Sequence, residues 1–484
     1  MNGNVKELHG IEPWEYDTDI RNHPLSIDLD LCTKQGLITY LDTTVSKEGW
    51  RTFIENLLQM SVLNANTERN RIQSILKTKT LTYQYLRKGL FERNEKETKV
   101  SIYEGETSFN FWDRKKILKK IYKLLGVLTP VWLVGYLIFS LPFLPLLLLI
   151  NLSLFLSYRS SSFRIWNQIR FYKETISRFQ FVWIRLSPHK REQIRKFAKH
   201  MENLGNSSEW IISPIPHFVL NVICLWDLWK VQSFEKWLKE NSELYKSLRL
   251  EWIQIEACLP ICEYWFLNPE TEFPSWNQSR EFFAESIAHP LIPKNSRIAN
   301  KLPALKPGSL MILTGSNMSG KTTYLRSIAI NLLISRVGGP ICGKNISISD
   351  FRIHTLIRSQ DSLEDGISFF YSEVRRLADI IRNTDVDDKT PILFLDEILK
   401  GTNSNERHIA TREILFALRE KGAIVFLTTH DLELANMEGA SLFHFTELEK
   451  DGEMTFDYQL RNGISKSTNA LKILKKEGIP IRDL

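Results

Sequence analysis

The sequence has few cysteines for its length and no excess of proline or glycine. Its 484 residues include five cysteines, 22 glycines and 18 prolines, and 43% of the residues are hydrophobic. These values exclude a disulfide miniprotein, a collagen and a disordered chain, and the length predicts two to four domains at about 100 to 200 residues each. No signal peptide is recognisable at the N-terminus, so we expect a reducing, cytosol-facing location. Cys258 and Cys262 have no second Cys or His pair at a matching distance, which favours buried thiols over metal ligands.

One stretch lacks charge altogether. Residues 124–158 contain no Asp, Glu, Lys or Arg over 35 positions. A membrane-spanning helix needs about 20 apolar residues, so this stretch predicts a transmembrane segment. Pro142 and Pro145 lie near its middle. One long tilted helix and two short spans of about 16 to 17 residues joined by a tight turn both fit.

Basic residues flank this stretch on both sides. Residues 114–123 include six lysines and arginines, and residues 159–199 include eleven, with only two acidic residues. The positive-inside rule assigns both flanks to the cytoplasm, which favours a hairpin over a single span. The basic clusters are typical of segments that bind anionic lipid headgroups. For the aromatic-rich residues 163–183, DNA binding is the alternative.

The pattern of residues predicts four regions. We expect a helical core-like domain over residues 1–122, a transmembrane helix or hairpin over 124–158, and a second helical core or lever region over 159–265. After a proline-rich loop at 268–276, short apolar runs alternate with helical periods. This alternation is typical of an α/β domain with a largely parallel sheet, which we place at 266–484.

The strongest motif is a complete GxxxxGK[ST] sequence at residues 315–322. An apolar run at 310–313 predicts a strand before it, and a helical pattern follows. In this context backbone N–H groups face the phosphates of ATP, Lys321 bridges the β and γ phosphates, and the Thr322 hydroxyl coordinates Mg²⁺. The predicted ATP-binding residues of this loop are Gly315, Ser316, Asn317, Met318, Ser319, Gly320, Lys321, Thr322 and Thr323.

Two further apolar runs end in polar residues. Residues 392–395 precede Asp396 and Glu397. We expect Asp396 to lie beside Thr322 as a second metal ligand and Glu397 to polarise the attacking water, although such a strand could merely close a sheet edge. The run at 423–427 leads to His430 at the same edge, where it would sense the γ-phosphate. Glu397 and His430 are therefore the predicted catalytic residues.

These motifs resemble those of the MutS family of DNA mismatch-repair ATPases, which belong to the ABC ATPase class. The segment 314–326 is similar to the family's phosphate loop, in which Asn-Met is unusual among ATPases. A weaker similarity covers residues 35–72 and the start of the family's helical core. Further similar elements are His289-Pro290, Ile298-Ala299-Asn300, Asp396-Glu397-Ile398, Gly401-Thr402 and Thr429-His430.

The resemblance also implies a composite site. Residues 361–370 are similar to the family's signature loop. By this match Ser368 reaches the γ-phosphate of a partner chain, in trans, and Glu373 lies on the helix behind it. A homodimer that uses ATP and Mg²⁺ and binds DNA is the implied assembly. The LSGGQ signature of transporter ATPases is missing, and one hairpin cannot build a translocation path.

The sequence departs from the family in three respects. The core-like segment begins within the first 40 residues, so we expect no mismatch-reading domain, and no Phe-x-Glu triplet lies outside the core-like or ATPase segments. Little sequence follows Pro480 for a dimer-securing helix-turn-helix. The apolar stretch also interrupts the helical region. We therefore expect a membrane-anchored, ATP-dependent DNA-binding protein with its helical core and ATPase domain on the cytoplasmic side. The alternative is a membrane-anchored nucleotide switch that binds a protein.

Overall fold

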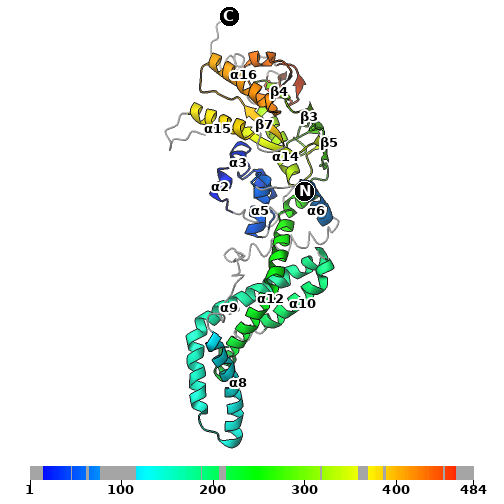
Figure 1. Cartoon of the computed structure of the whole chain (residues 1–484). Helices are drawn as coiled ribbons and strands as arrows, with labels where there is room; N and C mark the ends of the chain where they lie inside the picture. The colour runs from blue at the N-terminus through cyan, green and yellow to red at the C-terminus, as the bar shows by residue number, and fades with distance from the viewer. Residues whose placement is uncertain are drawn as a thin grey trace. The chain divides into compact units, whose positions relative to one another are not determined.

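The structure, a computed structural model of the whole chain, divides into two compact units (Figure 1). The sheet unit comprises residues 1–97 and 255–484, and the helical unit comprises residues 98–254. The helical unit thus includes the predicted transmembrane segment and most of the helical region predicted to follow it. The residues that the structure describes are 15–44, 46–60, 65–76, 116–186, 188–206, 214–316, 319–357, 369–384, 389–450 and 453–464.

Short helices form the N-terminal part of the sheet unit. They are α2 (Thr18–Arg21), α3 (Pro24–Asp28), α4 (Leu37–Leu41), α5 (Lys47–Leu57) and α6 (Ala65–Leu76), and α13 (Leu259–Leu267) joins them from later in the chain.

A buried carboxylate supports the first turn of α5. Ser46 caps this helix by accepting a hydrogen bond from the Gly49 N–H at 3.0 Å. The fully buried Glu256 in turn accepts bonds from the Ser46 N–H at 2.6 Å and from its hydroxyl at 2.7 Å. A negative charge at a helix N-terminus is favourable because the first N–H groups point toward it. A Cβ at Gly49 would lie 2.4 Å from Glu256 Cδ, so the close approach requires glycine.

Two sheets form the C-terminal part of the sheet unit. The smaller has the strand order β1-β5-β2-β3, with β1 (Ser275–Trp276), β2 (Phe282–Ile287), β3 (Asn300–Leu305) and β5 (Gly343–Ile348). The larger has the order β12-β9-β4-β8-β7-β6, with β4 (Leu310–Thr314), β6 (Phe351–Leu356), β7 (Thr390–Asp396), β8 (Ile424–Thr428), β9 (Ala440–His444) and β12 (Arg461–Asn462).

The larger sheet is parallel except for β12, which pairs antiparallel with β9. Its central strands β4 and β8 are buried at every residue. Parallel strands covered on both faces have continuous apolar sequences, which explains the runs found in the sequence. The α/β class predicted for the C-terminal region and the helical class predicted for the N-terminal region agree with this arrangement.

Helices and a hairpin accompany the larger sheet. The helices are α14 (Lys321–Arg336), α15 (Phe369–Asn383), α16 (Ser404–Glu420) and the short 3-10 helix η3 (Leu432–Asn436). Strands β10 (Glu447–Lys450) and β11 (Glu453–Phe456) pair antiparallel as a separate hairpin. Nearly all of α14 is buried, whereas α16 keeps one exposed side.

Ion pairs connect α14 and α15 to the N-terminal helices. On α15, Arg376 Nη2 lies 2.5 Å from Asp28 Oδ2 and also donates to the Thr355 carbonyl at 2.8 Å. On α14, Arg326 Nη1 lies 2.5 Å from Asp30 Oδ2. Asp28 has no exposed surface, so its charge depends on partners within the protein.

A side-chain amide continues the larger sheet beyond β6. Gln59 donates from Nε2 to the Ile353 carbonyl at 2.9 Å and accepts from the Ile353 N–H at 2.9 Å. These two bonds imitate the pairing of a further strand and satisfy backbone groups at the sheet edge.

The helical unit contains long helices. They are α8 (Lys116–Phe139), α9 (Leu144–Leu186), the 3-10 turn η1 (Pro188–Lys190), α10 (Arg191–Asn206), α11 (Pro214–Cys224) and α12 (Trp226–Glu256). Aromatic side chains pack together within it: Tyr172 contacts Phe234, Trp237 and Tyr245, and Phe197 stacks on Trp237 with ring centroids 5.1 Å apart.

The uncharged stretch folds as two helices with a turn between them. The chain leaves α8 at Phe139 and enters α9 at Leu144, and positive φ angles at Ser140 and Phe143 make the reversal. Lys119–Phe139 and Leu144–Ser177 are long and apolar enough to cross a membrane, by length and composition only. Pro142 lies in this turn, and Pro145 lies in the first turn of α9. Insertion into a membrane stays a prediction.

We predict that two arginines of α15 differ in their effect on stability, because the acidic partner of one is buried and that of the other is exposed. Replacing Arg376 with Met leaves the buried Asp28 carboxylate without its guanidinium, and we expect a loss of about 3 kcal/mol. The matched change Arg382→Met breaks an exposed pair with Asp379 on the same helix and should cost less than about 1 kcal/mol. Urea midpoints of the detergent-solubilised chain measure both. Equal shifts for the two variants would contradict the role given to Asp28.

Candidate nucleotide-binding site

The carboxyl ends of three neighbouring strands meet at one edge of the larger sheet. The loop after β4 leads to α14, β7 ends at Asp396, and β8 ends at Thr428. The strand register aligns Thr428 with Asp396 on one side and with Leu313 on the other. Ligands of open α/β sheets bind at this edge. The structure therefore brings Thr322, Asp396, Glu397 and His430 to one place, as their positions after predicted strands led us to expect.

Asp396 is held by two hydroxyl groups. Its Oδ2 accepts a hydrogen bond from Thr322 Oγ1 at 2.8 Å, and its Oδ1 accepts one from Thr428 Oγ1. Hydroxyl and carboxylate oxygens are the hard donors that Mg²⁺ prefers, so the chemistry of this pair fits the predicted metal ligands Thr322 and Asp396. The sequence did not identify Thr428 as the second partner of Asp396.

Lys321 lies at the start of α14 and is almost fully buried. Its Nζ donates to the carbonyls of Gly315 at 2.7 Å and Ser316 at 2.9 Å, and lies 3.9 Å from Glu397 Oε1. Burial lowers the pKa of the Lys321 ammonium, and the nearby Glu397 carboxylate opposes that shift. A buried cation bonded mainly to carbonyls can exchange those partners for a phosphate, which fits the predicted role of Lys321.

The loop around Lys321 requires glycine at its two ends. Gly315 has φ 140° and Gly320 has φ 106°, values that L side chains rarely adopt. A Cβ at Gly315 would lie 2.7 Å from the Phe445 carbonyl oxygen. Between them, Ser319 donates from its hydroxyl to the Ser316 carbonyl at 2.8 Å. Thr323 follows on α14 with an exposed side chain, and Asn317 and Met318 lie outside the described residues.

Glu397 adopts an uncommon backbone conformation with φ 48°. Its N–H donates to the Thr428 carbonyl at 3.1 Å and lies 3.2 Å from the Thr428 hydroxyl oxygen, and these bonds hold the conformation. A left-handed conformation in a non-glycine residue costs roughly 1 to 2 kcal/mol. Such strain clusters at functional sites, because there the surrounding structure fixes the direction of a side chain.

The carboxylate of Glu397 bonds to two basic groups. His430 Nε2 lies 2.9 Å from Oε1, and Lys400 Nζ lies 3.0 Å from Oε2. The His430 hydrogen bond is the main cause that lowers the pKa of Glu397 to about 2, against the opposing effect of burial and with help from Lys400. Glu397 is therefore ionised at neutral pH. The sequence did not indicate the contact with Lys400.

Glu373 positions the loop that follows Glu397. Its side chain is 4% exposed, and its Oε1 accepts a hydrogen bond from the Leu399 N–H at 2.9 Å. Burial raises the pKa of the Glu373 carboxyl group. Glu373 lies on α15, as the resemblance implied, and this helix follows the predicted signature segment. Ser368, the residue predicted to act in trans, lies outside the described residues.

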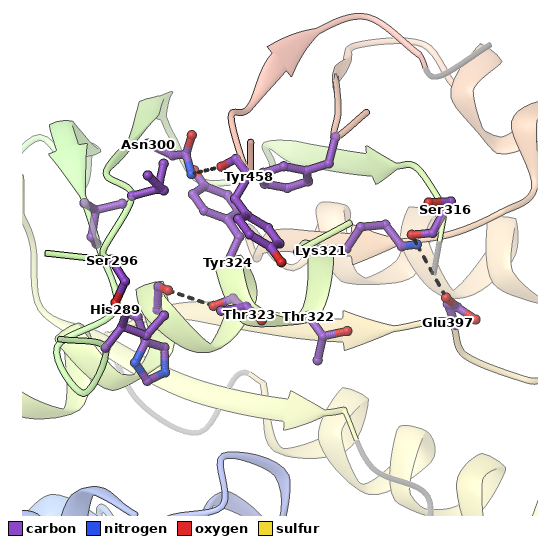
Figure 2. A pocket seen from close by; sticks show the side chains of 16 residues that line it. His289, Ser296, Asn300, Ser316, Lys321, Thr322, Thr323, Tyr324, Glu397 and Tyr458 are labelled. Carbon is purple, nitrogen blue, oxygen red and sulfur yellow. Dashed lines mark hydrogen bonds and ion pairs between the residues drawn. The ribbon is translucent and has the colours of Figure 1, made fainter. Parts of the chain in front are cut away.

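A cleft of about 440 Å³ extends from these residues (Figure 2). This volume lies within the range of about 300 to 1,000 Å³ that is typical of small-molecule sites. Ser316, Lys321 and Glu397 form one end of the cleft, and His289 and Ser296 lie toward the other, with Tyr324 and Tyr458 between them. The apolar side chains that line it are Ile287, Ile292, Ile298 and Phe445.

Asn300 fixes the wall of the cleft that Tyr458 supplies. It donates from Nδ2 to the Tyr458 carbonyl at 2.9 Å and accepts from the Leu460 N–H at 2.8 Å. The backbone of Tyr458 has φ 52°. Nothing in the sequence around Tyr458 signalled this position, because it depends on a pairing 158 residues away along the chain.

His289 lies at the far end of the cleft as a neutral side chain. Burial, helped by the charges of Arg326 and Arg297, lowers the pKa of His289 to about 4. Arg297 also holds the loop in shape by donating to the carbonyls of Ile292 at 2.9 Å and Pro290 at 3.0 Å. The cleft thus has a charged end and an uncharged end.

Comparison with known proteins finds similarity over the phosphate loop and the strands that follow it. The family model for MutS domain V matches residues 311–482. DNA mismatch repair protein MutS of Aquifex pyrophilus is 28% identical over 240 residues, which are 48% of this chain and 27% of that protein. The protein of the same name from Haloquadratum walsbyi is 30% identical over 40% of this chain and 22% of its own length.

A second kind of relative carries a different name. Endonuclease MutS2 of Staphylococcus epidermidis is 29% identical over 216 residues, which are 43% of this chain and 27% of that protein. The matches cover about a quarter of the length of these relatives. These matches show similarity to MutS and MutS2 proteins in the part of the chain that carries the phosphate-loop and Asp396-Glu397 motifs.

The lowered pKa of Glu397 predicts how acid affects stability. The ionised form is favoured in the folded state, so its stabilisation is present above pH 4.5 and is lost as the pH falls toward 2. Glu397→Gln removes that contribution, and we expect this variant to lose less stability than the wild type between pH 6 and pH 3. Thermal unfolding at both pH values measures the difference, and the exposed Glu413→Gln should follow the wild type. Equal losses in Glu397→Gln and the wild type would show that the folded chain does not favour the ionised carboxylate.

Proposed function

We propose that the chain is a MutS-type ATPase that hydrolyses ATP between two copies of itself and couples the nucleotide state to binding of DNA. The observation that carries this proposal is the grouping of Lys321, Thr322, Asp396 and Glu397 at one sheet edge. The match of residues 311–482 to MutS domain V supports it. Proteins of this family are ATPases, which makes an enzyme the expected class.

Binding of ATP begins at the charged end of the cleft. Lys321 exchanges the carbonyls of Gly315 and Ser316 for phosphate oxygens, and the N-terminus of α14 adds positive potential from its unpaired N–H groups. Thr322 and Asp396 would hold Mg²⁺, which when bound offsets negative charge on the phosphates. The nucleoside then occupies the uncharged end, against Ile298 and the ring of Tyr458. His289 is neutral at pH 7, so it can contact a base without introducing a charge.

Hydrolysis requires a change around Glu397. A carboxylate bonded to both His430 and Lys400 has little basicity left for an attacking water. We infer that closure on ATP releases one of these contacts and directs the carboxylate toward the water, while His430 turns to the γ-phosphate. Ser368 of a second copy would complete the site. Glu373 holds the Leu399 backbone in place and thereby connects α15 to the loop that carries Glu397.

DNA is the proposed partner, and the membrane is the proposed location. The names of the relatives refer to DNA mismatch repair and to an endonuclease, and residues 159–199 supply a net charge of +9 for phosphate contacts. The two apolar helices support anchoring of the chain at residues 124–158, with the helical core and the ATPase domain on the cytoplasmic side. The second candidate is a membrane-anchored switch that binds a protein. The two apolar helices support this candidate as much as the first, because both require a membrane anchor.

We predict that two substitutions separate ATP binding from hydrolysis. Lys321→Ala should weaken ATP binding by about 100-fold, because it removes a charged partner worth about 3 kcal/mol. Glu397→Gln should bind ATP normally but hydrolyse it at least about 100-fold more slowly, as expected on loss of a general base. Nucleotide binding and phosphate release measure the two effects. Lys306→Ala, at an exposed pair with Glu281, is the control. Wild-type hydrolysis by Glu397→Gln would exclude it as the base.

We predict that DNA binding depends steeply on salt. With four or more phosphate contacts, the affinity of the chain in detergent should fall by about 100-fold between about 50 and 200 mM salt. Replacing Arg191, Arg195 and Lys199 of α10 with Gln should reduce the slope of log affinity against log salt concentration, by an amount that corresponds to up to about three phosphate contacts. The exposed Lys236→Gln should leave this slope unchanged. Titrations of homoduplex, mismatched and branched DNA measure this. Hydrolysis that is indifferent to all three, with no binding, would favour the protein-binding switch.

A further inference from the structure

A cleft of about 810 Å³ lies in the helical unit where the uncharged stretch ends. One wall comes from α9, the other from α11, and Asp227 of α12 lies at its base. Its lining residues take no part in the nucleotide site of the sheet unit. The residues that line the cleft are Phe155, Leu156, Arg159, Ser160, Phe163, Trp166, His217, Phe218 and Asp227.

The wall on α9 crosses from the uncharged stretch into the basic one. Phe155, Arg159, Phe163 and Trp166 are spaced by three or four residues, so they lie on one face of the helix. Phe155 belongs to the uncharged stretch 124–158, and Arg159 is the first charged residue after it. If this stretch is in the membrane, Arg159 lies at the level of the lipid headgroups, where aromatic and basic side chains are both favoured.

The base of the cleft is polar and internally satisfied. Asp227 is 3% exposed, and its Oδ1 accepts hydrogen bonds from Trp166 Nε1 at 3.1 Å and His217 Nε2 at 2.8 Å. Its N–H donates to Asn221 Oδ1 at 2.9 Å. In the part of the chain that the structure describes, no acidic partner is found for Arg159. The positive charge of Arg159 is thus available to a ligand.

The rim of the cleft is apolar and exposed. Leu156 is 56% exposed, Phe163 58% and Phe218 46%. On α11, Ile215 and Val219 expose further apolar surface next to Phe218. Contiguous exposed apolar side chains of this size mark binding sites for other apolar surfaces. An arginine beside aromatic and aliphatic walls fits a ligand with an anionic head and an apolar tail.

We propose that this cleft binds one anionic phospholipid, with its phosphate beside Arg159 and Ser160 and an acyl chain against Phe155, Leu156 and Phe218. The proposal rests on the membrane placement proposed above for residues 124–158. A nucleic-acid backbone fits less well, because a strand of phosphates needs a row of cations. The lining offers one cation together with the Asp227 carboxylate at its base.

The test uses the full chain reconstituted in phosphatidylcholine vesicles that contain a photoactivatable phosphatidylglycerol. We expect the chain to float with the vesicles and the label to map to residues 155–166 and 214–227. Arg159→Gln should lower labelling there by about fivefold, the change that corresponds to the loss of about 1 kcal/mol per basic residue at an anionic surface. Arg164→Gln, an exposed arginine of α9 outside the cleft, should not.

A second pair of variants tests the cleft without changing charge. Ser160→Trp fills the cleft and should lower labelling as much as Arg159→Gln, whereas Ser157→Trp, exposed on α9 but outside the lining, should label like the wild type. The helix content of each variant, measured by far-ultraviolet circular dichroism, reports whether the helical unit is folded.

Three results would overturn the proposal. Flotation with labelling that neither Arg159→Gln nor Ser160→Trp lowers would remove the cleft but keep the membrane anchor. Failure to float would remove both. Displacement of the label by duplex DNA, with protection of the same peptides, would assign the cleft to a nucleic acid.

Discussion

The Asp396 carboxylate, which accepts hydrogen bonds from two threonine hydroxyl groups, organises the candidate site. Thr322 reaches Asp396 from the first turn of α14, and Thr428 reaches it from the end of β8. One carboxylate thus fixes the loop after β4 relative to the ends of β7 and β8. Thr428 in addition holds Glu397 through its backbone carbonyl, so the residue proposed as a metal ligand and the residue proposed as the general base share a single support.

Two buried carboxylates in the sheet unit are tolerated because each one has hydrogen-bonding partners within the protein. Asp28 and Glu256 are fully buried, and each bonds to groups on a different segment of the chain: Asp28 to Arg376 of α15, and Glu256 to Ser46 before α5. Buried ion pairs contribute little net stability, but the loss of one partner is costly. These contacts therefore specify which segments pack together more than they strengthen the packing.

Much of this architecture could be predicted because its signals are local. The phosphate-loop motif and the apolar runs before Asp396 and His430 are contiguous in sequence, and parallel strands place their ends at one edge. Thr428, Lys400 and Tyr458 could not be predicted, because their roles depend on strand register, on the turn after Glu397 and on a contact between distant segments. The sequence left one long helix and two spans open over residues 124–158, and the structure has two helices with Pro142 between them. Whether those helices enter a membrane depends on surroundings that a sequence pattern describes only indirectly.

Arg376 with Asp28 and Arg326 with Asp30 join the two helices nearest the site to one short N-terminal segment. Loss of either arginine alone removes the guanidinium beside a carboxylate, whereas joint replacement of both residues by apolar side chains removes both charges at once. In related sequences, either ion pair is therefore replaced most easily when both of its residues change together. Positions 28 and 376 should accordingly covary among related sequences, although 347 other residues separate them along the chain.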